Sequence, residues 1–103
     1  MVSVRFQKRG RAFEFTAFGH SGFSERGKDL VCSAVSILVY TLIDSIDKDM
    51  LESDPVVVME SGDVLFRVVA KPEAEKEIDG VFRVIRKGFR LLENNFPANI
   101  KIK

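Results

Sequence analysis

The sequence contains very few of the residues on which disulfides and metal sites depend. Among 103 residues there is one cysteine, Cys32, and one histidine, His20. A single cysteine cannot form an internal disulfide. Two candidate ligands also fall short of the four that a structural zinc site uses, so we expect no metal and no other cofactor.

An excess of one charge and a long apolar run are also missing. Sixteen basic and fifteen acidic residues leave a net charge of +1, so direct binding to nucleic acid is not expected. The segment from Leu30 to Ile46 is interrupted by Ser36, Asp44 and other polar residues, whereas a membrane span needs about 20 mostly apolar residues. We expect a buried helix there and no membrane contact. Because Met1 is followed by no leader pattern, we expect the cytoplasm.

What is present fits one folded unit. Hydrophobic residues make up 46% of the chain and charged residues 30%, which is typical of a soluble globular protein. A chain of this length can bury about two-thirds of its unfolded surface. We therefore expect a single domain over residues 1–103.

Hydrophobic periodicity predicts five strands and two helices in the order β-β-α-β-β-α-β. This order favours an α+β fold of two layers, with a mixed or antiparallel sheet and both helices packed on one face. Gly10 supplies the turn of the first hairpin. The predicted strands are Val2–Gln7, Phe13–Ala17, Val56–Glu60, Val64–Ala70 and Ile100–Ile102, and the predicted helices run from an N-cap at Asp29 to about Met50 and from Pro72 to Asn94.

The two predicted helices differ in pattern. The first is apolar on most faces, so other elements or a second subunit must cover it. The second has an apolar stripe and an opposite basic face, which is either solvated or directed at RNA or an acidic partner. The stripe comprises Ile78, Val81, Phe82, Ile85, Phe89 and Leu92, and the basic face comprises Arg83, Arg86, Lys87 and Arg90.

A glycine-rich segment precedes the first helix and contains the histidine. Residues Gly19 to Gly27 include three glycines and two serines, a composition typical of a mobile loop. Gly19, Gly22 and Gly27 match neither the phosphate-binding loop nor the dinucleotide fingerprint, so a nucleotide site is not favoured. His20 lies twelve residues before Cys32, and a loop that folds back would bring imidazole and thiol together.

Cys32 has the predicted placement of a nucleophile. With Asp29 as N-cap it is the third residue of the helix, where free N–H groups and the helix dipole favour a thiolate. Lys28 adds positive potential. His20 can accept the thiol proton and later protonate the leaving amine. The N–H groups at the helix start, including that of Cys32, are candidates for an oxyanion hole.

Each of these residues also has a simpler interpretation. A lone cysteine in an apolar helix is commonly an inert core residue, and a lone histidine in a glycine-rich loop is commonly a solvated one. Asp29 can act as an N-cap alone. Ser36, one turn beyond Cys32, can contact substrate or bond back to its own helix. Phe23 is apolar in a polar loop and can cover an apolar substrate side chain.

The residues around this loop resemble the ribosomal-processing cysteine protease family, often called Prp. The matching residues are Gly19-His20, then Gly27-x-Asp29-x-Val31-Cys32, then Ser36. The predicted order of elements fits that family over the whole chain.

The resemblance implies a cysteine endopeptidase with His20 and Cys32 as its catalytic pair and Asp29 and Ser36 in support. It implies cleavage of the N-terminal extension of the large-subunit ribosomal protein numbered twenty-seven, mainly in Firmicutes and related bacteria. It also implies a homodimer and a loop that moves to clamp the peptide. Two rival hypotheses stay open: a non-catalytic ribosome- or RNA-associated module that uses the basic face, and another Cys/His acyl-transfer enzyme.

Overall fold

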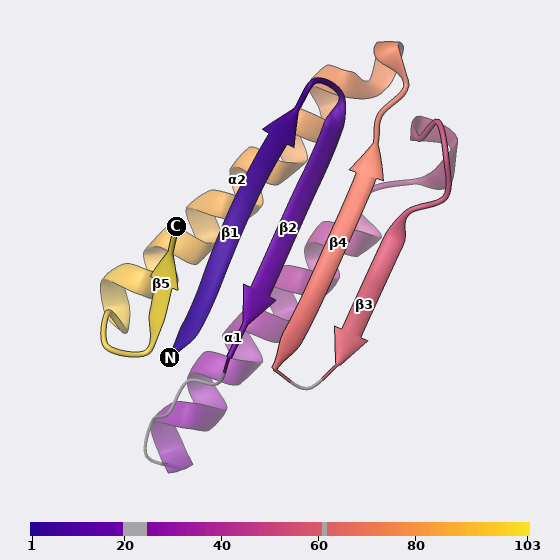
Figure 1. Cartoon of the computed structure of the whole chain (residues 1–103). Helices are drawn as coiled ribbons and strands as arrows, with labels where there is room; N and C mark the ends of the chain where they lie inside the picture. Colours follow the sequence, from indigo (N-terminus) through magenta and orange to yellow (C-terminus); the bar gives the residue numbers. More distant parts are fainter. Residues whose placement is uncertain (20–24, 61) are drawn as a thin grey trace.

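The chain folds into one five-stranded sheet with two long helices on one of its faces (Figure 1). The structure is a computed structural model that describes residues 1–19, 25–60 and 62–103, with residues 25–29 described by their backbone alone. The elements are β1 (Val2–Arg9), β2 (Ala12–Phe18), α1 (Glu25–Asp44), η1 (Lys48–Met50), β3 (Val56–Glu60), β4 (Asp63–Val69), η2 (Pro72–Ala74), α2 (Glu75–Asn95) and β5 (Ile100–Ile102).

The strand order in the sheet is β3-β4-β2-β1-β5. β1 pairs antiparallel with β2, β2 with β4, and β4 with β3, whereas β5 runs parallel to β1. The sheet is therefore mixed, and the predicted two-layer α+β fold is confirmed. Gly10, in the turn between β1 and β2, has a φ of +60°, which confirms its predicted role because glycine adopts positive φ at little cost.

The core forms where the alternating face of the sheet meets the apolar stripe of α2. Phe13 and Phe15 of β2 are buried, and the ring of Phe15 lies 5.3 Å from that of Phe89 in α2. Phe82 packs on Phe13 at 5.3 Å. Five of the six predicted stripe residues are buried, and Val81 is half-buried. Burying a large apolar side chain contributes about 1.5–3 kcal/mol, so these contacts dominate the stability of the layer packing.

The start of α1 differs from the prediction. The helix begins at Glu25, four residues before the predicted N-cap Asp29, so Gly27 lies within the helix and not in the loop. Two physical reasons account for the difference. Glutamate and arginine favour helices, and a single interior glycine costs only about 1 kcal/mol. An acidic residue in the first turn is also favourable against the helix dipole.

The end of α1 differs as well, because the helix stops at Asp44 and not near Met50. Beyond it the Ser45 hydroxyl donates a hydrogen bond to the Thr41 carbonyl at 2.6 Å, a local bond that competes with helix continuation. Residues Lys48–Met50 then form a separate 3-10 turn. In the described part of the chain, no helix is long and apolar enough to cross a membrane.

Candidate active site

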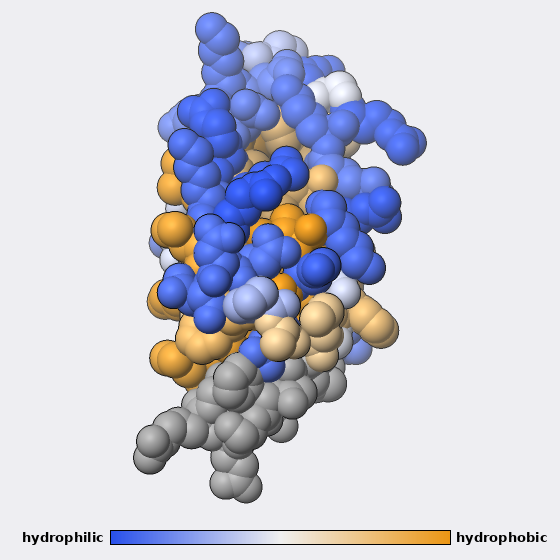
Figure 2. All heavy atoms as spheres, turned by 90° about the vertical axis from the view of Figure 1, so that its left-hand side faces the viewer, coloured by the Kyte–Doolittle hydropathy of each residue, from blue (hydrophilic) through white to orange (hydrophobic). Residues whose placement is uncertain are grey.

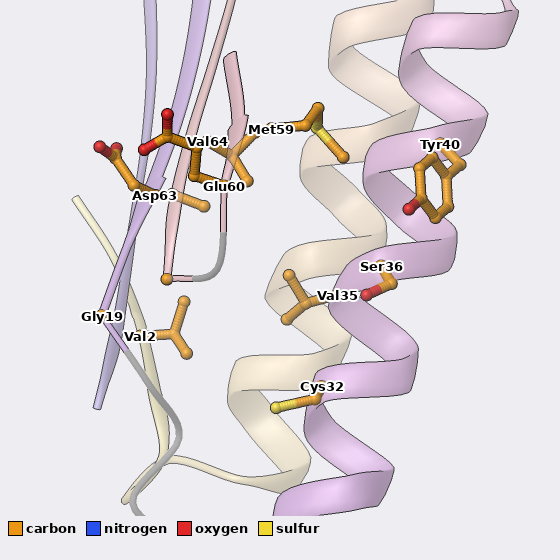
Figure 3. Close-up of a pocket in the computed structure, with 12 residues that line it drawn as sticks. Val2, Gly19, Cys32, Val35, Ser36, Tyr40, Met59, Glu60, Asp63 and Val64 are labelled. Atoms are coloured by element: carbon orange, nitrogen blue, oxygen red, sulfur yellow. The ribbon is translucent and has the colours of Figure 1, made fainter.

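A cleft of about 370 Å³ lies between α1 and the adjoining ends of the sheet strands (Figure 3). Its lining is mainly apolar and also includes one cysteine, one serine and two acidic residues. The side chains come from α1 on one wall and from the sheet on the other. The lining residues are Val2, Ala17, Gly19, Cys32, Val35, Ser36, Tyr40, Met59, Glu60, Gly62, Asp63 and Val64.

Cys32 is half-buried and lines this cleft. Its sulfur points from α1 toward the sheet (Figure 3). A cysteine that served only as core packing would be enclosed on all sides, as the neighbouring Val31 is. The thiol is thus held on a rigid helix and is open to a molecule in the cleft.

Ser36 and Tyr40 extend the same face of α1. They follow Cys32 at successive intervals of four residues, so the three side chains form one row along the helix, and all three line the cleft. Ser36 donates no hydrogen bond to the described residues, whereas the Thr41 hydroxyl bonds back to the Ile37 carbonyl at 2.6 Å. The back-bond of Ser36 to its own helix, which was one of its two interpretations, is therefore not seen among the described residues. Tyr40 was not predicted as a site residue, although its spacing from Cys32 pointed to it.

Gly19 fixes the end of β2 at the rim of the cleft. Its N–H donates to the Gly62 carbonyl at 2.9 Å, and its φ of +102° lies where L side chains are rarely found. A Cβ at this position would collide with the backbone carbonyl oxygen of Met1. The position therefore requires glycine. Gly19 is thus held in one place, and it is the residue immediately before His20.

The opposite wall was not predicted from the sequence. Met59 of β3 and Val64 of β4 are opposite each other in the strand register, and Met59 extends toward the helix layer (Figure 3). Glu60 and Asp63, at the end of the same hairpin, also line the cleft, but their carboxylates point to the side of the sheet away from α1 (Figure 3). No local sequence signal links these residues to Cys32, because only the packing of the hairpin over α1 brings them together.

The new helix start changes the predicted chemistry of Cys32. Cys32 is the eighth residue of α1, whereas the effect of the helix dipole is concentrated in the first turn. Only the first four N–H groups of a helix lack an intrahelical acceptor. The Cys32 amide is therefore not among the free donors of the helix start, and the prediction that it belongs to an oxyanion hole there is wrong.

The structure describes only some of the remaining predicted site residues. His20, Gly22 and Phe23 fall outside the described residues. Gly27 and Asp29 belong to α1 by their backbone. Asp29 precedes Cys32 by three residues and Ser36 by seven, which places all three on one helical face.

The basic face of α2 is partly engaged within the chain. Arg83 lies 4.0 Å from Asp79 in an ion pair, and the guanidinium of Arg86 lies 6.0 Å from the centre of the Phe6 ring. Nearby, a hydrogen bond to Glu75 raises the pKa of the Lys8 amine. Two of the four predicted basic residues thus have partners, which weakens the hypothesis of an open RNA-binding face.

Solved structures share this fold. The ribosomal processing protease Prp from Staphylococcus aureus, solved with a covalently linked product peptide, superposes with a TM-score of 0.75 at 16% identity, covering 100% of this chain and 98% of that one. The same protease with a substrate peptide gives 0.74 at 15% identity, with the same coverage of both chains. SMU.848 from Streptococcus mutans gives 0.74 at 22% identity over 100% of this chain and 92% of that one. At these identities the likeness defines the fold.

The class of the protein follows from its sequence family. The chain belongs to the family described as cysteine protease Prp, whose model matches residues 1–101. It is thus a cysteine peptidase, and the resemblance noted around Cys32 is confirmed. A search of curated proteins found no match.

Proposed function

We propose that the chain is a cysteine endopeptidase in which Cys32 is the nucleophile and His20 the general base. The observation that carries the proposal is the half-buried thiol of Cys32 in a cleft that Gly19 also lines. Gly19 is covalently joined to His20, and its hydrogen bond to Gly62 holds that end of β2 at the rim. The last described residue before His20 therefore lies at the rim of the cleft that holds the thiol.

The reaction proceeds through an acyl-enzyme. His20 takes the proton from the thiol, and the sulfur of Cys32 attacks the carbonyl carbon of the scissile peptide bond. The C–N bond breaks as His20 returns the proton to the leaving amine. Water then attacks the thioester, giving a free carboxylate and restoring the Cys32 thiol.

Neighbouring residues support this pair. Asp29 and Ser36 flank Cys32 on one helical face, and we assign them to steadying the nucleophile and contacting the peptide. Gly19 ends β2 at the rim of the cleft, and we assign Gly22 to the segment that carries His20, whereas Gly27 lies within α1. Phe23 covers an apolar substrate side chain.

The proposed substrate is the N-terminal extension of the large-subunit ribosomal protein numbered twenty-seven, removed in the bacterial cytoplasm during ribosome assembly. Support comes from the family, and from structural neighbours named as ribosomal processing proteases and solved with substrate or product peptides. The largely apolar walls of the cleft suit apolar side chains before the scissile bond.

The proposed assembly is a homodimer. Leu30 and Ile37 of α1 are exposed, and Ile37 leaves 62% of its surface open. A helix that exposes several large apolar residues gains stability when a partner covers them. This surface suits a second copy of the chain.

Incubation with the extended ribosomal precursor, followed by mass analysis of the products, tests the proposal. We expect wild type to release the extension at one bond, and Cys32→Ala, Cys32→Ser and His20→Ala to reduce the rate at least about 1,000-fold, because each removes a group that makes or breaks a bond. Ser33→Ala is the matched control, since Ser33 is exposed next to Cys32 and does not line the cleft. Processing at the wild-type rate by Cys32→Ala would refute the mechanism.

A further inference from the structure

Strand β3 (Val56–Glu60) is an open, apolar edge of the sheet. Within the described sheet it pairs with β4 alone. Val57 and Met59 face the helix layer, because their partners Phe66 and Val64 do so, yet 44% and 41% of their surfaces are exposed. The strand contains no lysine or proline, and its register with β4 is unbroken. It therefore has no lysine, proline or bulge to prevent another strand from pairing with this edge, and its one charged residue, Glu60, is the last of the strand.

The hairpin geometry shows which backbone groups of β3 are free. Glu60 and Asp63 face each other across the two-residue connection at 61–62, so they form the hydrogen-bonded pair that closes the hairpin. Bonded and non-bonded pairs alternate along antiparallel strands. Val58 consequently bonds to β4, whereas Val57 and Met59 direct both N–H and C=O to the open edge.

The opposite edge of the sheet is protected. β5 has only three residues and two lysines adjoin its isoleucines. The Ile102 N–H donates to the Glu93 carboxylate of α2 at 3.0 Å, so a side chain already occupies its donor. The side of the molecule that carries β5 and α2 is mainly hydrophilic (Figure 2). The contrast between the two edges singles out β3 as the one suited to strand addition.

The β3 edge leads directly into the cleft. Met59 belongs both to the open edge and to the lining shared with Cys32, and Glu60 follows it at the cleft wall. A peptide that lies along β3 and continues past Met59 therefore enters the cleft that holds the thiol. An extended peptide also matches the spacing of free backbone groups, which repeat every second residue.

We propose that β3 holds the substrate as an added strand. One extended segment of the peptide, on one side of the scissile bond, pairs with the free N–H and C=O groups of Val57 and Met59, while the scissile bond lies at Cys32. Backbone pairing gives affinity and cleft pockets read alternate side chains. The inference rests on the proposed protease function.

A scan of N-methylated substrate peptides tests the pairing with wild-type enzyme. Each peptide spans the cleavage site and carries one backbone N-methyl group. We expect a pattern with a period of two residues on one side of the scissile bond, in which methylation at a paired position raises KM about 10-fold and the position between leaves it nearly unchanged. Losses confined to the residues flanking the scissile bond would overturn strand addition alone. No cleavage of the unmodified peptide would overturn the protease function, and this inference with it.

Two variants of the enzyme complete the test. Val57→Pro removes the outward N–H of Val57 without touching a bond to β4, and proline is tolerated at such edge positions. Val57→Ala shortens the same side chain and keeps the N–H. We expect Val57→Pro to raise KM about 10-fold with kcat retained, and Val57→Ala to change KM less than about threefold, with thermal unfolding showing both folded. Unchanged KM together with a changed oligomeric mass for Val57→Pro would assign the edge to a second copy and overturn the proposal.

Discussion

Replacing Gly19 by alanine tests whether the end of β2 must be held in one conformation for the site to work. Gly19 has a φ of +102°, and an added Cβ would meet the Met1 carbonyl oxygen. Gly10, in the turn between β1 and β2, is a matched control. Its φ of +60° is also positive, but nothing lies within 4 Å of a Cβ added there. The two substitutions therefore share backbone strain and differ in steric overlap.

The expected losses of unfolding free energy follow from this difference. Gly10→Ala costs about 1–2 kcal/mol for a left-handed residue, reduced by about 0.4–1 kcal/mol because alanine restricts the unfolded chain. Gly19→Ala adds overlap with rigid backbone to a strain of about 1–3 kcal/mol, for a total of about 2–5 kcal/mol. A domain of this size is stable by about 5–15 kcal/mol. Since each kcal/mol shifts Tm by about 4–8 °C, Gly19→Ala should lower Tm by roughly 8–40 °C.

The effect on catalysis should exceed the effect on stability. Relief of the overlap moves Gly19, and with it the adjacent His20, which we propose as the base. A misplacement of about 1 Å costs about 100-fold in rate. We therefore expect kcat/KM for the precursor peptide to fall about 100-fold in Gly19→Ala and less than about twofold in Gly10→Ala.

The assay combines urea denaturation with peptide cleavage at a temperature where both variants remain folded. Circular dichroism confirms the folded state before each rate is measured. Suppose that Gly19→Ala unfolds at the same urea concentration as Gly10→Ala and cleaves at the wild-type rate. The proposal that the conformation of Gly19 positions His20 is then refuted.

Two further predictions concern helix packing and assembly. In α2, an added Cβ at Gly80 meets nothing within 4 Å, whereas at Gly88 it would lie 2.8 Å from Leu38 Cδ2 of α1. Gly80→Ala should therefore stabilise the protein by about 1 kcal/mol through helix propensity. Gly88→Ala should stabilise it clearly less or destabilise it. Equal shifts in the urea midpoint of the two variants would contradict the packing of Gly88 against Leu38. Ile37→Glu should convert the proposed dimer to a monomer in sedimentation, with exposed Val84→Glu in α2 as control; an unchanged dimer in Ile37→Glu would exclude that face of α1.

The sequence predicted the strands and the core of α2 correctly because local patterns define them. Alternation in β2 and the stripe through Ile78 and Phe89 directly reflect which side chains are buried. The start of α1 was wrong because Gly27 and Asp29 are strong local signals for a loop and an N-cap. The helix overrides both, since one glycine costs little against the packing of a long helix.

The candidate site was predictable only in part, because local patterns reveal residues on one helix but not residues that distant segments bring together. Cys32 was found because it is the one cysteine of the sequence, and Ser36 because it follows one helical turn later. Tyr40 continues that spacing and was overlooked. Met59 and Gly62 were beyond sequence reasoning. They lie more than twenty residues from Cys32 along the chain, and contact across the cleft depends on how the second hairpin sits over α1.

The sequence by itself determined the layer composition of the fold, the faces of its elements and the residues able to do nucleophilic chemistry, because these depend on local periodicity and residue type. The tertiary structure alone decided that β5 joins β1 in parallel, that β3 becomes an open edge, and that the Cys32 thiol opens into a cleft rimmed by Gly19. Strand order and cleft walls are set by contacts between distant segments. The energy of those contacts comes from how whole layers pack, and no local pattern records it.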